Sequence, residues 1–304
     1  MYKAFYHLTR NPFEITPDPT FLFPTKRHNE ALAAIYYGVR RHRGFVVMTG
    51  EVGTGKTLLI RCLLKLLKCG TDSYAYIFNS KLSSLEFLQY MAGDLGLKPT
   101  DRSKSTLLLD LASFLIARHE NKLTTVLVVD EAHHLSADVL EEIRLLTNLE
   151  TAREKLLQIL LVGQPELDEK LDSFELRQLK QRIALRWKLE RLCQEEIKGY
   201  IERRLQRAGA NSHASGLFPS DTIAAIHQHC RGIPRLINTV CENALIAAYA
   251  RQARSVTPDI IDEVAADFRL GAIHPVKVEA EPRPEKVWQA VKTLLELRDR
   301  LHGI

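Results

Sequence analysis

A short glycine-rich stretch near the start of the chain constrains the fold more than any other feature. Residues 50–57 match the pattern G-x-x-x-x-G-K-[ST], directly after the apolar run Phe45–Thr49 and at the start of a helical pattern over Lys56–Cys69. Glycines let backbone N–H groups converge on phosphate oxygens, and the positive end of the following helix strengthens that attraction. We therefore expect a strand, a phosphate-binding loop and a helix in succession. The expected nucleotide-binding residues are Gly50, Glu51, Val52, Gly53, Thr54, Gly55, Lys56, Thr57 and Leu58.

The chemistry expected at this loop involves a second motif further along the chain. Lys56 is placed to reach the β- and γ-phosphates of a nucleotide, and the Thr57 hydroxyl to ligate Mg²⁺. The apolar strand pattern Thr125–Val129 ends in two acids, Asp130 and Glu131. Ligands of open α/β sheets lie outside the carboxyl ends of the strands. We therefore expect Asp130 to hold Mg²⁺ and Glu131 to polarise the attacking water. The expected cofactors are ATP and Mg²⁺, and the expected reaction is ATP hydrolysis.

Two more polar residues are candidates for the same site. Gln164 follows the strand pattern Gln158–Val162, so its amide is expected beside the two acids, where it orients water; the alternative is an ordinary loop glutamine. Arg235 lies in the first turn of a predicted helix, where a cation opposes the helix dipole. This placement predicts an anion such as the γ-phosphate opposite Arg235, and the alternative is a surface arginine.

The stretch Leu176–Arg186 contains three arginines, Arg177, Arg182 and Arg186. One of them is expected to project into the phosphate site of a neighbouring subunit as an arginine finger, and Arg182 is our choice. The alternative is that all three form a solvated basic face.

Alternating strand and helix patterns predict the fold class, a doubly wound α/β core with a parallel sheet sandwiched by helices. After about Leu192 the strand patterns stop, and helical patterns predict a small all-α lid. The expected strands are Phe45–Thr49, Tyr74–Phe78, Thr125–Val129 and Gln158–Val162. The expected divisions are an N-terminal linker segment over 1–43, the nucleotide-binding core over 44–191, the helical lid over 192–270, and a linker with an amphipathic helix over 271–304.

The composition argues against a membrane-spanning protein, and the net charge does not distinguish between classes of partner. No apolar run approaches the ~20 residues that a membrane helix needs, and the polar amino terminus lacks the core of a signal peptide. The net charge of +5, from 42 basic and 37 acidic residues, fits a mixed surface as well as a nucleic-acid face. Five cysteines without a CxxC pair fit a reducing compartment, so we expect a cytoplasmic protein.

The motif set resembles the AAA+ ATPases and, more narrowly, the ExeA/GspA–MshM family of secretion- and pilus-associated ATPases. Further blocks carry this resemblance: Asn11-Pro12-Phe13, His28-Asn29-Glu30-Ala31-Leu32, residues 145–150, residues 162–167, residues 176–183 and Gly232-Ile233-Pro234-Arg235-Leu236-Ile237-Asn238. The resemblance implies Walker A roles for Lys56 and Thr57, Walker B roles for Asp130 and Glu131, and sensor roles for Gln164 and Arg235. It also implies a homo-oligomeric ring or filament, with Arg182 acting in trans, that works on an envelope secretion, pilus or polysaccharide-export complex, at the inner membrane without spanning it.

The resemblance leaves some roles open and departs from the family in one respect. Pro12-Phe13 is expected either to touch adenine or to form a structural clasp on the core. The longer ExeA-type proteins continue into a membrane span and a peptidoglycan-binding domain, which this chain lacks, so we expect the short form. The TniB/TnsC transposition ATPases resemble the same core, and a DNA-binding regulator of transposition is therefore the alternative function. The helix expected near the carboxyl terminus is assigned either to a partner or to the lid.

Overall fold

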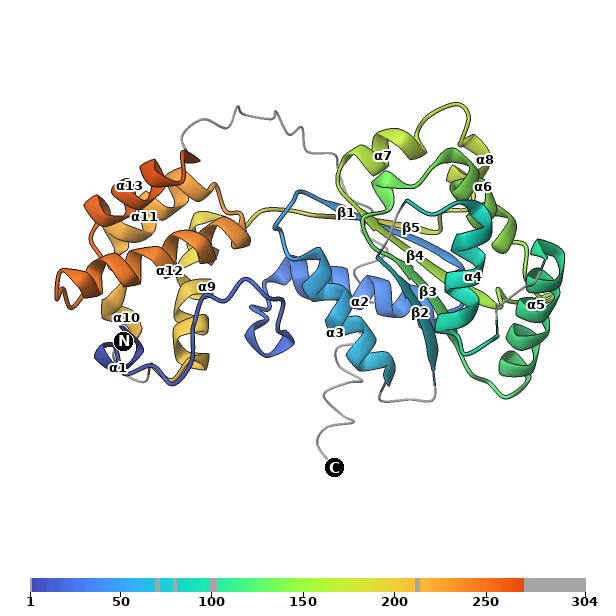
Figure 1. Ribbon diagram of the computed structural model, residues 1–304, viewed down its shortest axis with the longest axis horizontal. Helices are drawn as coiled ribbons and strands as arrows, with labels where there is room; N and C mark the ends of the chain where they lie inside the picture. Colours follow the sequence, from blue (N-terminus) through green and yellow to red (C-terminus); the bar gives the residue numbers. More distant parts are fainter. Residues whose placement is uncertain (1, 69–71, 79–80, 99–102, 211–213, 271–304) are drawn as a thin grey trace. The chain divides into compact units, whose positions relative to one another are not determined.

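The computed structural model describes residues 2–68, 72–78, 81–98, 103–210 and 214–270, which form two compact units (Figure 1). The α/β unit contains Arg27–Glu51 and Leu59–Leu189. The helical unit contains the residues up to Lys26, Val52–Leu58 and the described residues from Glu190 onward. The predicted lead-in over 1–43 is thus divided between the units, and the predicted linker and helix over 271–304 lie outside the described residues.

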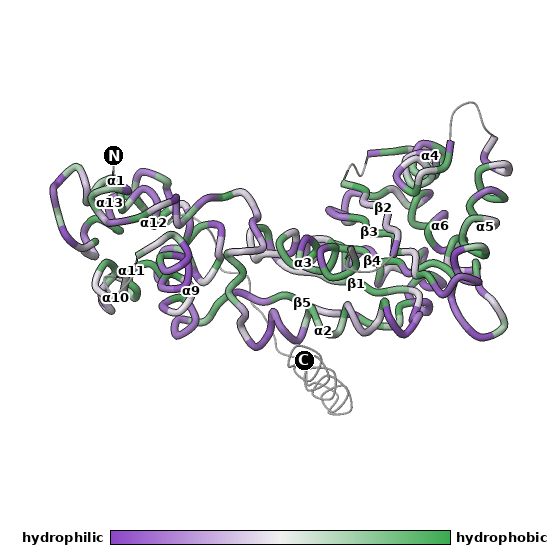
Figure 2. Tube along the Cα trace, turned by 90° about the horizontal axis from the view of Figure 1, so that it is seen from below, coloured by the Kyte–Doolittle hydropathy of each residue, from purple (hydrophilic) through white to green (hydrophobic). Residues whose placement is uncertain are grey.

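The α/β unit is built on a five-stranded parallel sheet with the strand order β2-β3-β4-β1-β5. The strands are β1 Phe45–Gly50, β2 Ser73–Ile77, β3 Thr125–Val129, β4 Leu157–Gly163 and β5 Leu185–Leu189. Every residue of β1, β3 and β4 is buried, as expected for central strands covered on both faces. In Figure 2 the hydrophobic colour follows these central strands, and the hydrophilic colour marks the outer turns. The predicted parallel α/β core is confirmed.

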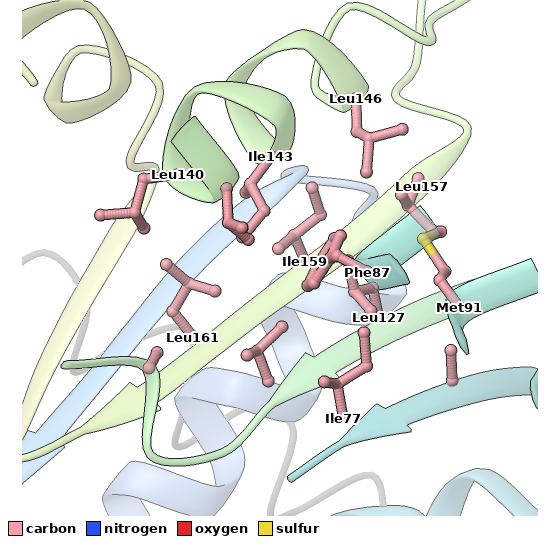
Figure 3. Close-up of a cluster of buried hydrophobic side chains, with 14 of the residues drawn as sticks. Ile77, Phe87, Met91, Leu127, Leu140, Ile143, Leu146, Leu157, Ile159 and Leu161 are labelled. Carbon is pink, nitrogen blue, oxygen red and sulfur yellow. The ribbon is translucent and has the colours of Figure 1, made fainter. Parts of the chain in front are cut away.

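Helices cover both faces of this sheet. One face carries side chains such as Val47, Leu127 and Ile159, which form a continuous core with α4, α5, α6, α7 and α8. Figure 3 shows part of this core, including Leu127, Ile159 and Ile143. On the other face, Gly38 of α2 lies against the side chains of Val46 and Leu185. The helices are α2 Lys26–Arg40, α3 Lys56–Lys68, α4 Ser84–Asp94, α5 Lys104–Glu120, η2 Ala132–His134, α6 Ala137–Leu146, α7 Glu166–Leu171 and α8 Arg177–Lys180.

Two helices in this unit start with side-chain caps. Ser83 and Glu86 form a capping box at the start of α4. Ser136 accepts a hydrogen bond from the backbone N–H of Val139 at the start of α6. Both caps satisfy donors that the first helical turn leaves unpaired, so these boundaries follow from local sequence.

The strand patterns did not predict β5, which begins at the end of the arginine-rich stretch Leu176–Arg186. It is an edge strand beside β1, and its residues Leu185, Arg186, Trp187 and Lys188 alternate between half-buried and exposed before the buried Leu189. Such an edge strand lacks the continuous apolar run that identifies the central strands in the sequence.

The helical unit has its own core, built from α9, α11, α12 and α13 together with the amino-terminal segment. Its elements are α1 Tyr2–Phe5, η1 Pro19–Phe21, α9 Gln194–Arg207, α10 Ala214–Leu217, α11 Ser220–Cys230, α12 Pro234–Ala250 and α13 Pro258–Asp267. The four longer helices all follow Leu192, in the part of the chain where the sequence predicts a small all-α lid. None of the helices in the described ranges has the length and apolar character that a membrane crossing requires.

The amino-terminal segment is fastened to α9 by one buried arginine. Arg204 donates from Nε to the carbonyl of Pro12 at 2.7 Å and from Nη2 to the carbonyl of Glu14 at 3.0 Å. Its guanidinium also lies over the ring of Phe21. Phe13, 1% exposed, packs edge-on against Phe218. Of the two expected roles, the structure therefore supports the clasp, and it places that clasp on the helical unit instead of the α/β core.

Candidate nucleotide site

The predicted phosphate loop begins where β1 ends and closes with the first turn of α3. Gly50 is the last residue of β1, residues 51–55 form the turn, and Lys56, Thr57 and Leu58 open the helix. Gly53 and Gly55 have φ values of 80° and 103°. Residues with L side chains rarely adopt these left-handed conformations, so the backbone of the loop favours glycine at both positions. The strand, loop and helix predicted from the sequence are thus present in the predicted order.

Arg235 lies directly against this loop within the helical unit. Its backbone N–H donates to the carbonyl of Gly53 at 3.2 Å. A Cβ built on Gly53 would lie 2.7 Å from Cβ of Arg235 and 3.1 Å from Cγ2 of Ile233. The first turn of α12 and the phosphate loop are therefore in van der Waals contact. The prediction that the Arg235 guanidinium faces a γ-phosphate stays a prediction.

A second glycine explains how the chain reaches that position. Gly232 has a φ of 76°, and its carbonyl accepts a hydrogen bond from the backbone N–H of Leu192 at 2.8 Å. A Cβ on Gly232 would come within 2.0 Å of the Leu192 carbonyl oxygen, so no larger residue fits this backbone. Pro234 then begins α12, a position that suits its fixed φ and missing N–H.

In the α/β unit, the first acid after β3 is held by a strand neighbour. Asp130 is 4% exposed, and its backbone N–H donates to the carbonyl of Ile77, which extends the pairing of β2 and β3. Its Oδ1 accepts from the N–H of Glu131 at 2.9 Å, and its Oδ2 accepts from the Tyr76 hydroxyl at 3.0 Å. Burial, and then the Asp130 carboxylate, raise the pKa of Tyr76 well above its usual range, so the phenol remains a donor.

Sequence reasoning missed Tyr76. Its role follows from the register of β2 against β3, which pairs Tyr76 with Val128 and is known only from the folded sheet. A hydroxyl at that point of the neighbouring strand can reach the residue that follows β3.

The second acid is held in an unusual backbone conformation beside two polar side chains. Glu131 has φ 52° and ψ 36°, a left-handed conformation that costs a non-glycine residue about 1–3 kcal/mol. Its Oε2 lies 3.5 Å from Nε2 of Gln164 and 3.4 Å from Nδ1 of His133. The N–H of Gln164 donates to the same Nδ1 of His133 at 3.4 Å. The structure thus brings Gln164 to Glu131, as predicted, and adds His133, to which the sequence had assigned no role.

The three arginines considered for the finger all have partners within the α/β unit. Arg182 is exposed and donates to Oδ1 of Asn148 at 3.1 Å. Arg186 forms ion pairs with Asp172 and Asp168 at 3.2 and 3.5 Å, and Arg177 lies over the exposed ring of Phe174. Arg182 also interacts electrostatically with the Glu150 carboxylate, whose pKa it helps to lower. The trans role of Arg182 stays a prediction.

The chemistry of the predicted metal ligands fits Mg²⁺. Thr57 offers a hydroxyl and Asp130 a buried carboxylate, and Mg²⁺ prefers such hard oxygen donors. The Tyr76 hydroxyl fixes the orientation of that carboxylate and leaves further lone pairs on its oxygens.

Comparisons with known proteins agree with this arrangement. Residues 39–171 match the model of a family described as AAA domain. General secretion pathway protein A of Aeromonas hydrophila is 41% identical over 291 residues, which cover 95% of this chain and 50% of that protein. The chain therefore spans about half the length of this curated relative.

Solved structures show the same fold at low sequence identity. Cdc6p of Pyrobaculum aerophilum matches with a TM-score of 0.61 and 18% identity, over 87% of this chain and 70% of that one. The ADP form of ORC2 from Aeropyrum pernix matches with a TM-score of 0.61 and 15% identity, over 94% and 88%. RuvB of Thermotoga maritima matches with a TM-score of 0.53 and 16% identity, over 80% and 69%. At these identities the likeness concerns the fold alone. The chain thus contains an AAA domain over residues 39–171, and across 95% of its length it resembles the ExeA/GspA-like AAA+ ATPases.

Proposed function

We propose that this protein hydrolyses ATP with Mg²⁺. The observation that carries the proposal is the order of three neighbouring parallel strands, β3, β4 and β1. Their carboxyl ends lie at one edge of the sheet. Asp130 and Glu131 follow β3, Gln164 follows β4 after Gly163, and the phosphate loop follows β1. Carboxylates, an amide and a phosphate-binding loop therefore leave the sheet at the same edge, where ligands of open α/β sheets bind.

Each residue has a distinct role in this proposal. The loop N–H groups and Lys56 bind the β- and γ-phosphates, while Thr57 and Asp130 hold Mg²⁺, which neutralises phosphate charge when bound. The Glu131 carboxylate accepts a hydrogen bond from the attacking water and polarises it. Gln164, 3.5 Å from that carboxylate, keeps Glu131 and the water aligned. Arg235 stabilises the charge of the γ-phosphoryl group in cis, and Arg182 does so in trans.

Phosphate release and nucleotide binding, measured separately, test these roles. We expect Lys56→Ala to abolish nucleotide binding, and Glu131→Gln to bind ATP normally while losing hydrolysis by at least about 100-fold. Lys198→Ala and Glu141→Gln are matched controls, because both residues are exposed on helices that carry none of the proposed site residues. Unchanged phosphate release in Glu131→Gln would contradict the assigned mechanism.

We further propose that the protein is a cytoplasmic oligomer that acts on an envelope complex for secretion, pilus assembly or polysaccharide export, peripherally at the inner membrane. The 41% identity to General secretion pathway protein A supports this proposal. Glu131→Gln should hold the ATP-bound state, so it should co-purify with inner-membrane assembly proteins in the presence of ATP. Lys56→Ala should not. If both variants co-purify with the same proteins, or if neither does, the proposal of an ATP-dependent role at the envelope is wrong.

A further inference from the structure

Three potential metal ligands gather at the edge of the sheet opposite the phosphate loop. His42 precedes β1 by three positions, His119 lies in the last turn of α5 before β3, and Glu154 precedes β4 by three positions. One ligand atom from each residue lies within 4.8 Å of the other two. All three belong to the α/β unit, at the amino ends of its central strands. No step of the proposed ATP hydrolysis uses them.

The side chains face one another with the spacing of an open coordination site. The ring centroids of His42 and His119 are 6.2 Å apart with an interplanar angle of 72°. Nδ1 of His42 lies 4.0 Å from Oε2 of Glu154 and 3.3 Å from the carbonyl of Lys155.

The backbone holds the His42 turn firmly against β4. Arg43 donates its N–H to the carbonyl of Gly38, closing the end of α2. Gly44 donates its N–H to Oε1 of Gln158 at 2.9 Å, and the Gly44 carbonyl accepts from the N–H of Ile159. These bonds set the distance between the segment that carries His42 and the segment that carries Glu154.

The other two candidate ligands are also on anchored segments. The N–H of Glu154 donates to Oγ1 of Thr151 at 3.1 Å, and its carbonyl accepts from the N–H of Thr151 at 2.9 Å. The carbonyl of His119 accepts from the N–H of Lys122, and the neighbouring Arg118 donates from Nε to Oγ1 of Thr125 on β3. The backbone segments that carry the three candidate ligands are therefore ordered before a metal binds, which lowers the entropic cost of binding.

We propose that His42, His119 and Glu154 bind a divalent transition-metal ion, for which Zn²⁺ is the best fit. Two imidazoles and one carboxylate are ligands that Zn²⁺ accepts, and with only three protein ligands a further coordination position is open to water. The site is accessible, because the side chain of His42 is 19% exposed and that of Glu154 is 49% exposed. The ion joins the end of α2, the end of α5 and the segment before β4, and so stabilises the α/β unit from the edge that does not bind nucleotide.

The test uses the full chain without a histidine tag. Co²⁺ is titrated first, because ligation by imidazole in a four-coordinate site gives strong visible absorption bands, whereas octahedral hydrated Co²⁺ absorbs only weakly. Zn²⁺ binding is then measured by calorimetry, and its effect on the melting temperature by thermal unfolding. Addition of EDTA should reverse that effect. We expect one equivalent to bind, and Zn²⁺ at about 100 times its dissociation constant to raise the melting temperature by roughly 5 °C.

Matched variants give the decisive comparison. His42→Ala, His119→Ala and Glu154→Gln should each weaken Zn²⁺ binding at least tenfold. His229→Ala, a half-buried histidine paired with Asp262 in the helical unit, should leave it unchanged. Lys56→Ala should also bind Zn²⁺ normally, so a failure of the proposed ATPase and a failure of this site are distinguishable. The proposal is overturned if wild-type protein shows no such binding, or if the His42→Ala/His119→Ala double variant binds Zn²⁺ as tightly as wild type.

Discussion

The contact between the phosphate loop and α12 can be tested by adding a single methyl group. Gly53→Ala places a Cβ 2.7 Å from Cβ of Arg235 and 3.1 Å from Cγ2 of Ile233, at a φ of 80°. Because the nearest atom is a Cβ next to the backbone, it cannot move without moving the first turn of α12. Gly96→Ala is the matched control, since Gly96 has a φ of 84° and its new Cβ would meet nothing within 4 Å.

The two substitutions share one energetic cost and differ in the other. Placing an L residue in the left-handed region costs about 1–2 kcal/mol in both variants. Overpacking costs typically about 1–3 kcal/mol more, and only Gly53→Ala incurs it. Since about 1.4 kcal/mol is a tenfold change in an equilibrium constant, we expect the dissociation constant for ATP to rise roughly 5- to 100-fold in Gly53→Ala. It should stay unchanged in Gly96→Ala.

A fluorescent ATP analogue measures the affinity, and urea unfolding measures the free energy of unfolding of both variants. Gly53→Ala should remain folded, with weakened nucleotide binding and a loss of stability at least as large as that of Gly96→Ala. Equal ATP affinity in the two alanine variants would refute the reasoning, because it would mean that α12 does not constrain the loop when nucleotide binds.

Four further predictions concern other parts of the molecule. Tyr76→Phe removes a hydrogen bond to a buried carboxylate, so it should lower the free energy of unfolding by about 1–3 kcal/mol and raise the Mg²⁺ concentration needed for half-maximal hydrolysis; unchanged values in both assays would contradict this. Arg204→Met leaves the Pro12 and Glu14 carbonyls without their donor, and limited proteolysis should then cut residues 8–24 faster than in wild type. Arg182→Ala should lower kcat of ATP hydrolysis about 1,000-fold with unchanged ATP affinity, and an unaltered kcat would refute its trans role. Duplex DNA should not bind at physiological salt, whereas ATP-dependent, strongly salt-sensitive binding would favour the transposition alternative.

The parts of the fold that the sequence predicts well are those fixed by local patterns. β1, β3 and β4 are buried at every residue, so their apolar runs identify them without knowledge of the fold. Helix α5 was not predicted, although Ser103 caps it and Leu107, Leu111 and Leu115 bury one face, because exposed apolar residues such as Leu109 blur its pattern. β5 was missed for the related reason that pairing with β1, and not its own composition, makes it a strand.

Within the candidate site, sequence reasoning found the residues that carry charge or a motif and missed those defined by packing. Asp130, Glu131 and Gln164 could be predicted because each follows a recognisable strand. Tyr76 and His133 could not, since their roles depend on strand register and on a backbone turn at Glu131. Motifs report the groups that act on a ligand, whereas the groups that orient them are known only once the chain is folded.

At the start of α12, the contact with the phosphate loop is made by the backbone of Arg235, although the sequence draws attention to its charge. Pro234 supplies no N–H, so the N–H of Arg235 is among the first of those that the start of a helix leaves without an intrahelical partner. The carbonyl of Gly53 accepts from that N–H. Gly232 is needed for the close approach to Leu192 that sets this position. The contact with the phosphate loop is therefore made by the backbone, so substituting the guanidinium of Arg235 removes a charge without removing the contact. The charge and the docking of α12 can accordingly be separated by experiment, the first at Arg235 and the second at Gly53.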